Sequence, residues 1–158
     1  MPNEGFHRHD HSACVETALA SAEARCAKER LRLTPVRRRI LEILLEEHRA
    51  LGAYDILDRL RAEGMAAQPP VAYRALEFLV GNGFAHRIER RSAYIACTEQ
   101  DPDHAPMFLI CRSCDSIAES SIKRTDLARE AKHAGFVIEH QVLEAEGLCP
   151  ACTDTAAP

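Results

Sequence analysis

Two Cys-x-x-Cys pairs in the last third of the chain have the residue types and the spacing of a metal site. The pairs are Cys111 with Cys114 and Cys149 with Cys152. Each pair can supply two thiolates from one tight turn, and four thiolates complete the tetrahedral shell of a structural Zn²⁺. The gap between the pairs exceeds the usual ribbon spacing, so a folded segment must lie between them. Two matched pairs favour this closed zinc site over two disulfides or a redox Cys-x-x-Cys.

The cysteine count and the N-terminus favour a reducing compartment. The 158 residues include seven cysteines, an odd number, and the first residues lack the apolar segment of a secretory signal. No apolar run approaches the length that spans a membrane. We therefore expect a cytoplasmic protein with reduced thiols and no membrane partner. With no Trp and few other aromatic residues, a small second domain would have a thin core, which a metal ion would help to hold together.

Charge is distributed unevenly along the chain. Residues 1–100 carry 15 Lys and Arg against 14 Asp and Glu, a net of +1, and residues 101–158 carry 5 against 10, a net of −5, which together give the total of −4. Such asymmetry indicates two modules with different partners. Basic residues cluster at Arg37–Arg39, where a solvated helix face is the preferred interpretation, and at Arg87, Arg90 and Arg91.

The first hundred residues predict helices followed by a hairpin. The period of the apolar residues and the cap signals favour helices at residues 13–30, after Thr34-Pro35, at Ala53–Glu63 and at Pro69–Val80. Two short strands are expected at residues 85–89 and 93–97, joined by a turn at Arg90-Arg91-Ser92. This order of elements predicts a winged helix-turn-helix domain, which we place at residues 13–98.

The segment Pro69–Val80 is the candidate DNA-reading helix. Its apolar face points inward, which leaves Tyr73, Arg74 and Glu77 on the outward face. Arg74 can pair with a guanine edge, and Tyr73 can reach a phosphate or a thymine methyl group. Arg90 and Arg91, in the hairpin turn, can contact phosphates. Many small helical domains that do not touch DNA share this pattern, so it does not by itself decide the partner.

A polar segment with two prolines, Thr98–Pro106, separates this domain from the rest, and we place a hinge at residues 99–105. Beyond it, strands are expected at 106–111 and 116–119, a helix at Thr125–Ala134 and a strand at Phe136–Glu146. This module, residues 106–152, is the folded segment that the cysteine pairs would close. The fold class is therefore α+β, with an N-terminal winged helix-turn-helix domain and a small C-terminal α/β dimerisation domain with structural zinc.

Both ends of the chain, residues 1–12 and 153–158, are expected to be disordered. The head is rich in histidine and could bind metal loosely through His7, His9 and His11, but an inert head is the preferred interpretation. His133 and His140 are candidates for partial metal ligands, with a structural role preferred. Cys26 lies on the inner stripe of the first helix and is expected in the core.

Short motifs along the whole chain match one known pattern, and they are Arg32–Arg37, Ala53–Leu57, Pro69-Pro70 with Tyr73–Leu76, Gly83–His86, Cys111–Cys114, His140–Glu144 and Gly147–Cys152. In these motifs the chain resembles the ferric uptake regulator family of repressors, and within it the zinc-sensing members. The similarity covers about residues 15–152. In one departure, the family usually has Thr-Val before Tyr-Arg in the reading helix, whereas this chain has Val71-Ala72 and so lacks a hydroxyl that could cap the helix or touch a phosphate.

The resemblance implies a second, regulatory metal site with ligands at His86, Cys97, His104 and Glu119. Two imidazoles, one thiolate and one carboxylate suit Zn²⁺, so two Zn²⁺ per chain are expected. From the residues alone, the four could equally be unrelated polar side chains. The resemblance also implies that Tyr54 acts on DNA together with Arg74.

We therefore expect a zinc-responsive transcriptional repressor that binds operator DNA as a metal-loaded homodimer and controls zinc uptake genes. An iron- or peroxide-responsive regulator of the same family is the nearest alternative, although iron sensors more often use nitrogen and oxygen donors where this chain has Cys97. A zinc-stapled scaffold and a zinc enzyme are alternatives from other classes. Four protein ligands leave no open position for a catalytic water, and neither a deaminase signature nor His-Glu-x-x-His is present, so an enzyme is not expected.

Overall fold

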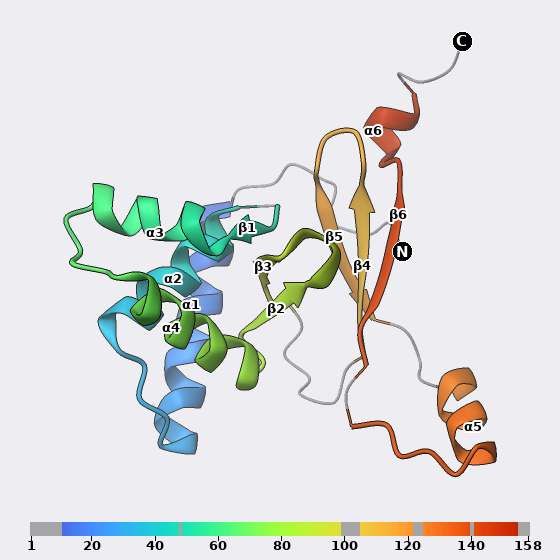
Figure 1. Ribbon diagram of the computed structural model, residues 1–158. Coiled ribbons are helices and arrows are strands. Elements are labelled where there is room, and N and C mark those ends of the chain that lie inside the picture. Colours follow the sequence, from blue (N-terminus) through green and yellow to red (C-terminus); the bar gives the residue numbers. More distant parts are fainter. Residues whose placement is uncertain (1–10, 48, 99–104, 122–124, 140, 155–158) are drawn as a thin grey trace. The chain divides into compact units, whose positions relative to one another are not determined.

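The computed structural model describes residues 11–47, 49–98, 105–121, 125–139 and 141–154 (Figure 1). The chain divides into two compact units, which separate between Thr98 and Glu99. We call residues 8–98 the first unit and the part of the chain from residue 99 onward the second unit. Most of the expected hinge, residues 99–104, lies outside the described residues. No helix in the described ranges is both long enough and apolar enough to cross a bilayer.

Four helices build the first unit, and local signals in the sequence explain where they begin. The backbone N–H of Arg37 donates to the Thr34 side chain, which caps the second helix, and Pro35 occupies its first turn. The apolar residues of the second, third and fourth helices meet in one core that includes Ile40, Leu60 and Leu76. The helices are α1 (His11–Glu29), α2 (Pro35–Glu46), α3 (Ala53–Ala62) and α4 (Pro69–Gly81).

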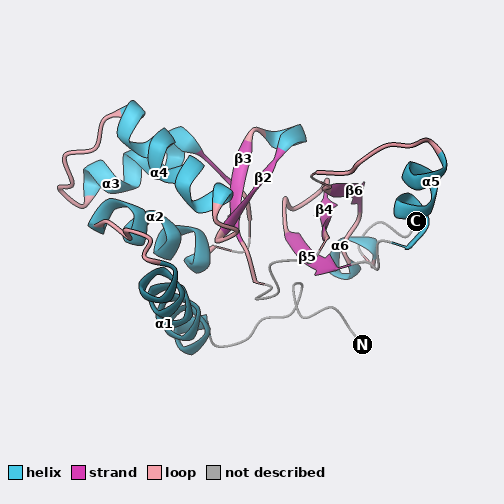
Figure 2. Ribbon diagram, turned by 90° about the horizontal axis from the view of Figure 1, so that it is seen from below, coloured by secondary structure: helices cyan, strands magenta, loops and turns pink. Residues whose placement is uncertain are grey.

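A small sheet completes the first unit (Figure 2). Strands β2 (Ala85–Ile88) and β3 (Ala93–Ala96) form an antiparallel hairpin, and β1 (Leu51–Gly52) pairs with the other edge of β3. The hairpin turns through a single 3₁₀ turn, Glu89–Arg91, and through Ser92, whose φ is 47°. The predicted winged helix-turn-helix architecture is confirmed. The two-residue β1 was not predicted, because so short a strand carries no periodicity.

The second unit is built on a three-stranded sheet in the order β5-β4-β6. Strand β4 (Pro106–Cys111) pairs antiparallel with β5 (Ile117–Ser121) and parallel with β6 (Leu143–Gly147). Helix α5 (Thr125–His133) lies between β5 and β6 in the chain, and α6 (Pro150–Thr153) follows β6. The sheet and α5 agree with the predicted fold class, whereas α6 was not predicted.

The strand predicted at Phe136–Glu146 is wrong over its first half, since β6 begins only at Leu143. Gly135 has a φ of 66°, and the Phe136 N–H donates to the Ala131 carbonyl at 2.8 Å. The backbone at these two residues therefore closes the end of α5 instead of starting a strand. Phe136 and Val137 are exposed by 67% and 80%, which explains why an apolar pair there does not mark a strand of the core.

Candidate metal centres and nucleic-acid interface

The two cysteine pairs leave the sheet of the second unit at the same end. Cys111 is the last residue of β4, and its partner on the parallel strand β6 is Gly147, the last residue of that strand. Cys114 follows Cys111 in a tight turn in which the Asp115 N–H donates to the Cys111 carbonyl at 3.0 Å. The parallel pairing of β4 and β6 is thus what brings together two motifs that lie far apart in the sequence. The second pair follows β6 directly, with Cys149 at the N-cap of α6 and Cys152 within that helix.

The four sulfur atoms form one cluster. They all lie within 4.8 Å of one another, and the Cys114 and Cys149 Sγ atoms are 3.7 Å apart. None of the four cysteines forms a disulfide, so neither of the disulfides considered from the sequence is present. Cys111 and Cys149 are buried, whereas Cys114 is exposed and Cys152 is half-buried.

The surroundings of the cluster favour thiolate in the first pair. Backbone N–H groups, above all that of Cys149 at 3.4 Å, lower the pKa of Cys111 to about 6. The Ser116 side chain, 3.1 Å from Sγ, lowers the pKa of Cys114. A hydrogen bond with Ser113 lowers the pKa of Cys152, but the neighbouring thiols Cys149 and Cys114 outweigh it and raise the pKa to about 12. Four clustered sulfur donors, two of them with a lowered pKa, fit a Zn²⁺ ion.

Two of the four expected regulatory ligands lie together on the hairpin of the first unit. His86 is in β2 opposite Ile95, and Cys97 stands two residues beyond Ile95. That spacing places both side chains on one face of the hairpin. A ring nitrogen of His86 and the Cys97 sulfur lie within 4.8 Å of each other, and both residues are half-buried. This pair can supply an imidazole and a thiolate to one metal ion.

The other expected metal ligands are placed as follows. Glu119 is half-buried in β5 of the second unit, opposite Phe108. His104, His7, His9 and His140 lie outside the described residues, and the His11 side chain is not described either. His133 is exposed at the end of α5 and belongs to no group of metal-ligand side chains among the described residues.

A hollow of about 520 Å³ opens on the first unit, where α3, α4 and the hairpin meet. Tyr54 and Tyr73, both expected to contact DNA, line it and are 64% and 41% exposed. All three tyrosines of the chain therefore line the hollow, and two of them are exposed to solvent. Sequence reasoning assigned no role to its other lining residues, which are Gly52, Ala53, Glu77, Arg87, Ser92 and Tyr94.

Tyr94 and Arg87 show why this hollow was missed. The cluster of basic residues that includes Arg87 is visible in the sequence, but only the pairing of β2 with β3, which sets Arg87 opposite Tyr94, shows that they share a site. Burial raises the pKa of Tyr94, with a smaller opposing effect from Arg87, so the phenol keeps its proton at neutral pH. The hollow therefore offers phenolic hydroxyl groups and a guanidinium, which suit contacts with a sugar-phosphate backbone.

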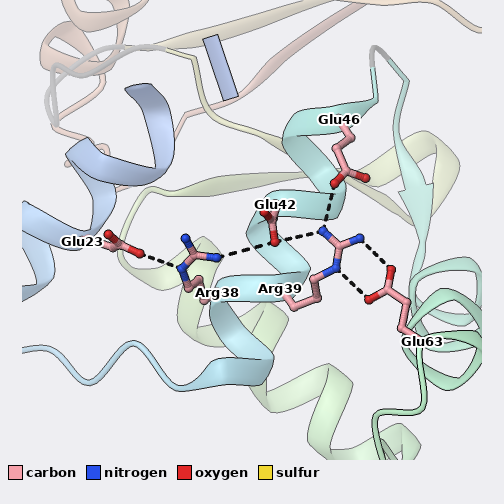
Figure 3. Close-up of polar contacts among 6 residues, drawn as sticks. All are labelled: Glu23, Arg38, Arg39, Glu42, Glu46 and Glu63. Atoms are coloured by element: carbon pink, nitrogen blue, oxygen red, sulfur yellow. Dashed lines mark hydrogen bonds and ion pairs between the residues drawn. The ribbon is translucent and has the colours of Figure 1, made fainter. Parts of the chain in front are cut away.

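Arginines on α2 and α4 differ in how they are engaged. Arg74 of α4 is exposed and forms no ion pair within the described part of the chain. By contrast, Arg38 pairs with Glu23 at 2.6 Å, and Arg39 pairs with Glu63 at 2.6 Å (Figure 3). Arg38 and Arg39 also reach Glu42, and Arg39 reaches Glu46.

The interpretation of Arg37–Arg39 as a solvated face is wrong for two of the three residues. Arg37 and Arg39 are half-buried, and Arg37 lies over the ring of Phe78. Arg37, Arg38 and Arg39 contact residues of other elements, which the local sequence does not reveal. The contacts are with Phe78 of α4, Glu23 of α1 and Glu63 just after α3, respectively.

Comparison with known proteins decides the family. The model of the ferric uptake regulator family matches residues 28–146. The chain belongs to the ferric uptake regulator family. It is 39% identical, over 146 residues, to the zinc uptake regulation protein of Escherichia coli strain K12, a match that covers 90% of this chain and 85% of that protein.

Two solved structures are similar to this chain over about nine tenths of its length. A zinc uptake regulator complexed with zinc and DNA has a TM-score of 0.86 and 37% sequence identity, and the match covers 91% of this chain and 98% of the other. The holo form of XcZur has a TM-score of 0.73 and 34% identity, with 90% and 98% covered. The family match begins at residue 28, near the end of α1, and ends at residue 146, before the second cysteine pair.

Proposed function

We propose that this chain is a zinc-responsive transcriptional repressor that binds operator DNA as a metal-loaded homodimer and controls zinc uptake genes. The observation that carries the proposal is a winged helix with exposed Tyr54, Tyr73 and Arg74, in a chain 39% identical to a zinc uptake regulation protein. An exposed arginine on the helix of such a domain is suited to reading base edges.

The four-cysteine cluster is the structural zinc site of the proposal. Cys111, Cys114, Cys149 and Cys152 would hold one Zn²⁺ in a closed shell of four sulfurs. Such a shell leaves no position for a catalytic water, which supports a structural role and speaks against an enzyme. The cluster joins the end of the chain to the end of β4 and thereby holds the parallel pair β4 and β6 together.

A second zinc site would make the repressor responsive. His86 and Cys97 supply the donors of the first unit, Glu119 supplies one from β5 of the second unit, and His104 lies in the segment between them. Bound zinc would cross-link these donors, so that its affinity favours one arrangement of the units. The Cys97 thiolate supports zinc over an iron- or peroxide-responsive regulator, since thiolates are soft donors that zinc accepts readily.

DNA recognition would divide between base reading and backbone contacts. Arg74 and Tyr54 would meet base edges in the major groove, and Tyr73 would meet a phosphate or a thymine methyl group. Arg90 and Arg91, both exposed at the hairpin turn, would contact phosphates. In a homodimer the two copies of α4 would enter successive major grooves of a pseudo-palindrome.

The second unit supports dimerisation. Strands β5 and β6 form the two edges of its sheet. Four large apolar side chains of the second unit are exposed. Exposed apolar residues and open strand edges favour association with a second copy. The four residues are Leu127, Phe136, Val137 and Leu143.

The decisive experiment removes one donor of the responsive site at a time. Cys97→Ser and His86→Ala should preserve the fold, the dimer and the four-cysteine zinc, yet abolish zinc-dependent binding to operator DNA. Dialysed protein should hold two zinc ions per chain in the wild type and one in either variant, by the count of donor sets.

Matched controls come from cysteine and histidine residues outside both donor sets. Cys14 is exposed on α1, and His133 is exposed at the end of α5. Cys14→Ser and His133→Ala should keep two zinc ions and normal repression. If Cys97→Ser also bound two zinc ions and repressed normally, the responsive site would lie elsewhere and this part of the proposal would fail.

A further inference from the structure

Two arginines and two phenylalanines of the first unit form one continuous stack, which we call the aromatic ladder. The Arg37 guanidinium lies 3.8 Å from the centre of the Phe78 ring, and the Arg25 guanidinium lies 4.6 Å from the centre of the Phe84 ring. The two rings stack on each other, with centroids 6.5 Å apart and planes inclined by 28°. These distances fall within the range of attractive cation–π and aromatic contacts.

The ladder joins three helices of the first unit to the start of the hairpin. Arg25 comes from α1, Arg37 from α2 and Phe78 from α4, and Phe84 lies immediately before β2. Arg25 also donates a hydrogen bond to the Asn82 carbonyl at 2.5 Å, and the Asn82 amide donates to the Phe78 carbonyl at 2.7 Å. Helix α1 therefore holds the C-terminal end of α4 through both a ring contact and a hydrogen bond.

One end of the ladder reaches the exposed face of α4. Phe78 stands four residues after Arg74, so the two side chains lie on one side of the helix, one turn apart. Arg37 and Phe84 hold Phe78 from two other elements. The ladder therefore contacts α4 on the side that carries Arg74, one turn away from it.

The other end of the ladder reaches the metal donors of the hairpin. Phe84 is only 7% exposed, and its N–H donates to the Leu79 carbonyl of α4 at 2.8 Å. The Phe84 carbonyl accepts a hydrogen bond from the N–H of Cys97 at 2.9 Å, and His86 follows two residues later. One buried residue is therefore hydrogen-bonded both to Leu79 of α4 and to Cys97, the residue that follows β3.

We propose that the aromatic ladder couples the metal donors on the hairpin to the DNA-reading face of α4, with Arg25 and Arg37 as positioning residues. The inference rests on the proposed function, because it concerns the effect of zinc at His86 and Cys97. Packed side chains transmit small shifts, since no void between them can absorb a displacement. A shift of the hairpin at Cys97 is passed to Phe84 and then, through the stacked rings, to Phe78 and α4.

Arg25 is the informative residue of the ladder. It precedes residue 28, where the family match begins, whereas its partners Phe84 and Asn82 lie within the match. Its side chain is 34% exposed and also pairs with Glu29 within α1. Removal of Arg25 loosens the ladder at the hairpin end without removing any proposed ligand or DNA contact.

The test compares operator affinity with zinc and with chelator present for the full-length wild type and for Arg25→Ala. The variant should bind as many zinc ions as the wild type. The ratio of its operator affinity with zinc to that with chelator should be about tenfold smaller than in the wild type, the loss expected for one coupling contact. Arg25→Lys keeps a cation over the Phe84 ring and should restore most of the gain. Arg37→Ala removes the other end of the ladder and should reproduce the loss, which keeps the test decisive if Arg25→Ala unfolds.

Arg38→Ala is the matched control. It removes the same charge and also breaks a tie between α1 and α2, since Arg38 pairs with Glu23 and Glu42, but Arg38 is not part of the ladder. Its zinc-induced gain should equal that of the wild type. An equal loss of affinity with and without zinc in Arg25→Ala, or a loss matched by Arg38→Ala, would overturn the inference. A wild type that gains no affinity with zinc would instead overturn the proposed function, and the inference with it.

Discussion

Each of the two units of this chain is stabilised by a different physical means. The first unit has a continuous apolar core to which all four helices and the hairpin contribute, with Ile40, Ile56 and Leu76 fully buried. In the described part of the second unit the buried side chains are few. Apart from Ala105 and Pro106 at the start of β4, they are Phe108, Ile110, Ile117 and Ala118 of the sheet together with Cys111 and Cys149.

This difference indicates which unit needs a metal ion for its stability. Burial of apolar surface is enough for a four-helix unit of this kind, whereas a three-stranded sheet with a thin core requires another source of stability. Two of the buried residues of the second unit are themselves sulfur donors, and α5 buries no side chain among its described residues. We infer that the second unit depends on its four-cysteine cluster and on a second copy of the chain, and that the first does not.

The largest expected effect comes from breaking the four-cysteine cluster. Cys114→Ser should destabilise the second unit by an amount on the order of 10 kcal/mol, because the free energy of metal binding is also free energy of folding in small modules. The first unit should stay folded. Sedimentation should show that the dimer is lost. Circular dichroism during thermal melting should show that the helices of the first unit remain folded.

Removal of zinc from the wild type by a strong chelator should reproduce this result. Cys14→Ser, which changes an exposed cysteine outside the cluster, is the control and should melt like the wild type. An intact dimer and an unchanged melting curve in Cys114→Ser would mean that the second unit folds without its metal, and the contrast between the units would disappear.

The next effect tests the first unit in the same way. Leu60 is fully buried in α3, and Leu60→Ala should lower the free energy of unfolding by about 2–5 kcal/mol, because it removes apolar contacts and leaves a cavity. Val71→Ala, at a side chain 39% exposed in α4, should change it by less than about 0.5 kcal/mol. The zinc content of the four-cysteine cluster should remain one ion per chain in both variants. Loss of that zinc in Leu60→Ala would show that the units do not fold separately.

Prediction from sequence succeeded where the signal is local. The Thr34 cap, the prolines that open α2 and α4, and the period of the apolar residues located the helices, and the alternation of strands located the hairpin. The strand expected at Phe136–Glu146 failed because the cap after α5 depends on the conformation of Gly135, which apolar residues beside it obscure. The helix α6 has four residues, too few for a period to be recognised.

The site shows the same limit. Spacing alone grouped the four cysteines, because both pairs are local motifs with a known use. The hollow beside α4 depends on the register of β2 against β3, and the ion pairs of Arg38 and Arg39 join residues as far apart as Glu23 and Glu63. Contacts at such separation leave no trace in a single sequence, so the ion pairs of Arg38 and Arg39 cannot be predicted before the fold is known.

A smaller effect concerns DNA binding by the first unit and should leave the stability of both units unchanged. Arg74→Ala should cost about 1–3 kcal/mol of operator binding per half-site and relax the preference at one base position. Arg38→Ala is the control, because its guanidinium is already paired with Glu23 and Glu42. A binding assay over a set of operator variants measures both. Unaltered affinity and selectivity in Arg74→Ala would show that α4 is not the reading helix.

The smallest effect is a test of the cap that begins α2. Thr34 has an extended backbone, with φ −68° and ψ 160°, and its side chain accepts a hydrogen bond from the Arg37 N–H. Thr34→Ala removes that bond and should lower the free energy of unfolding of the first unit by about 1 kcal/mol, a decrease of roughly 4–8 °C in its melting temperature. Thr17→Ala is the matched control: Thr17 is exposed within α1, where alanine favours the helix. Because α2 belongs to the unit that its own core stabilises, Thr34→Ala should shift only the melting of the first unit. A shift of the second unit by the same amount would mean that one cooperative transition joins both, contrary to the comparison drawn above.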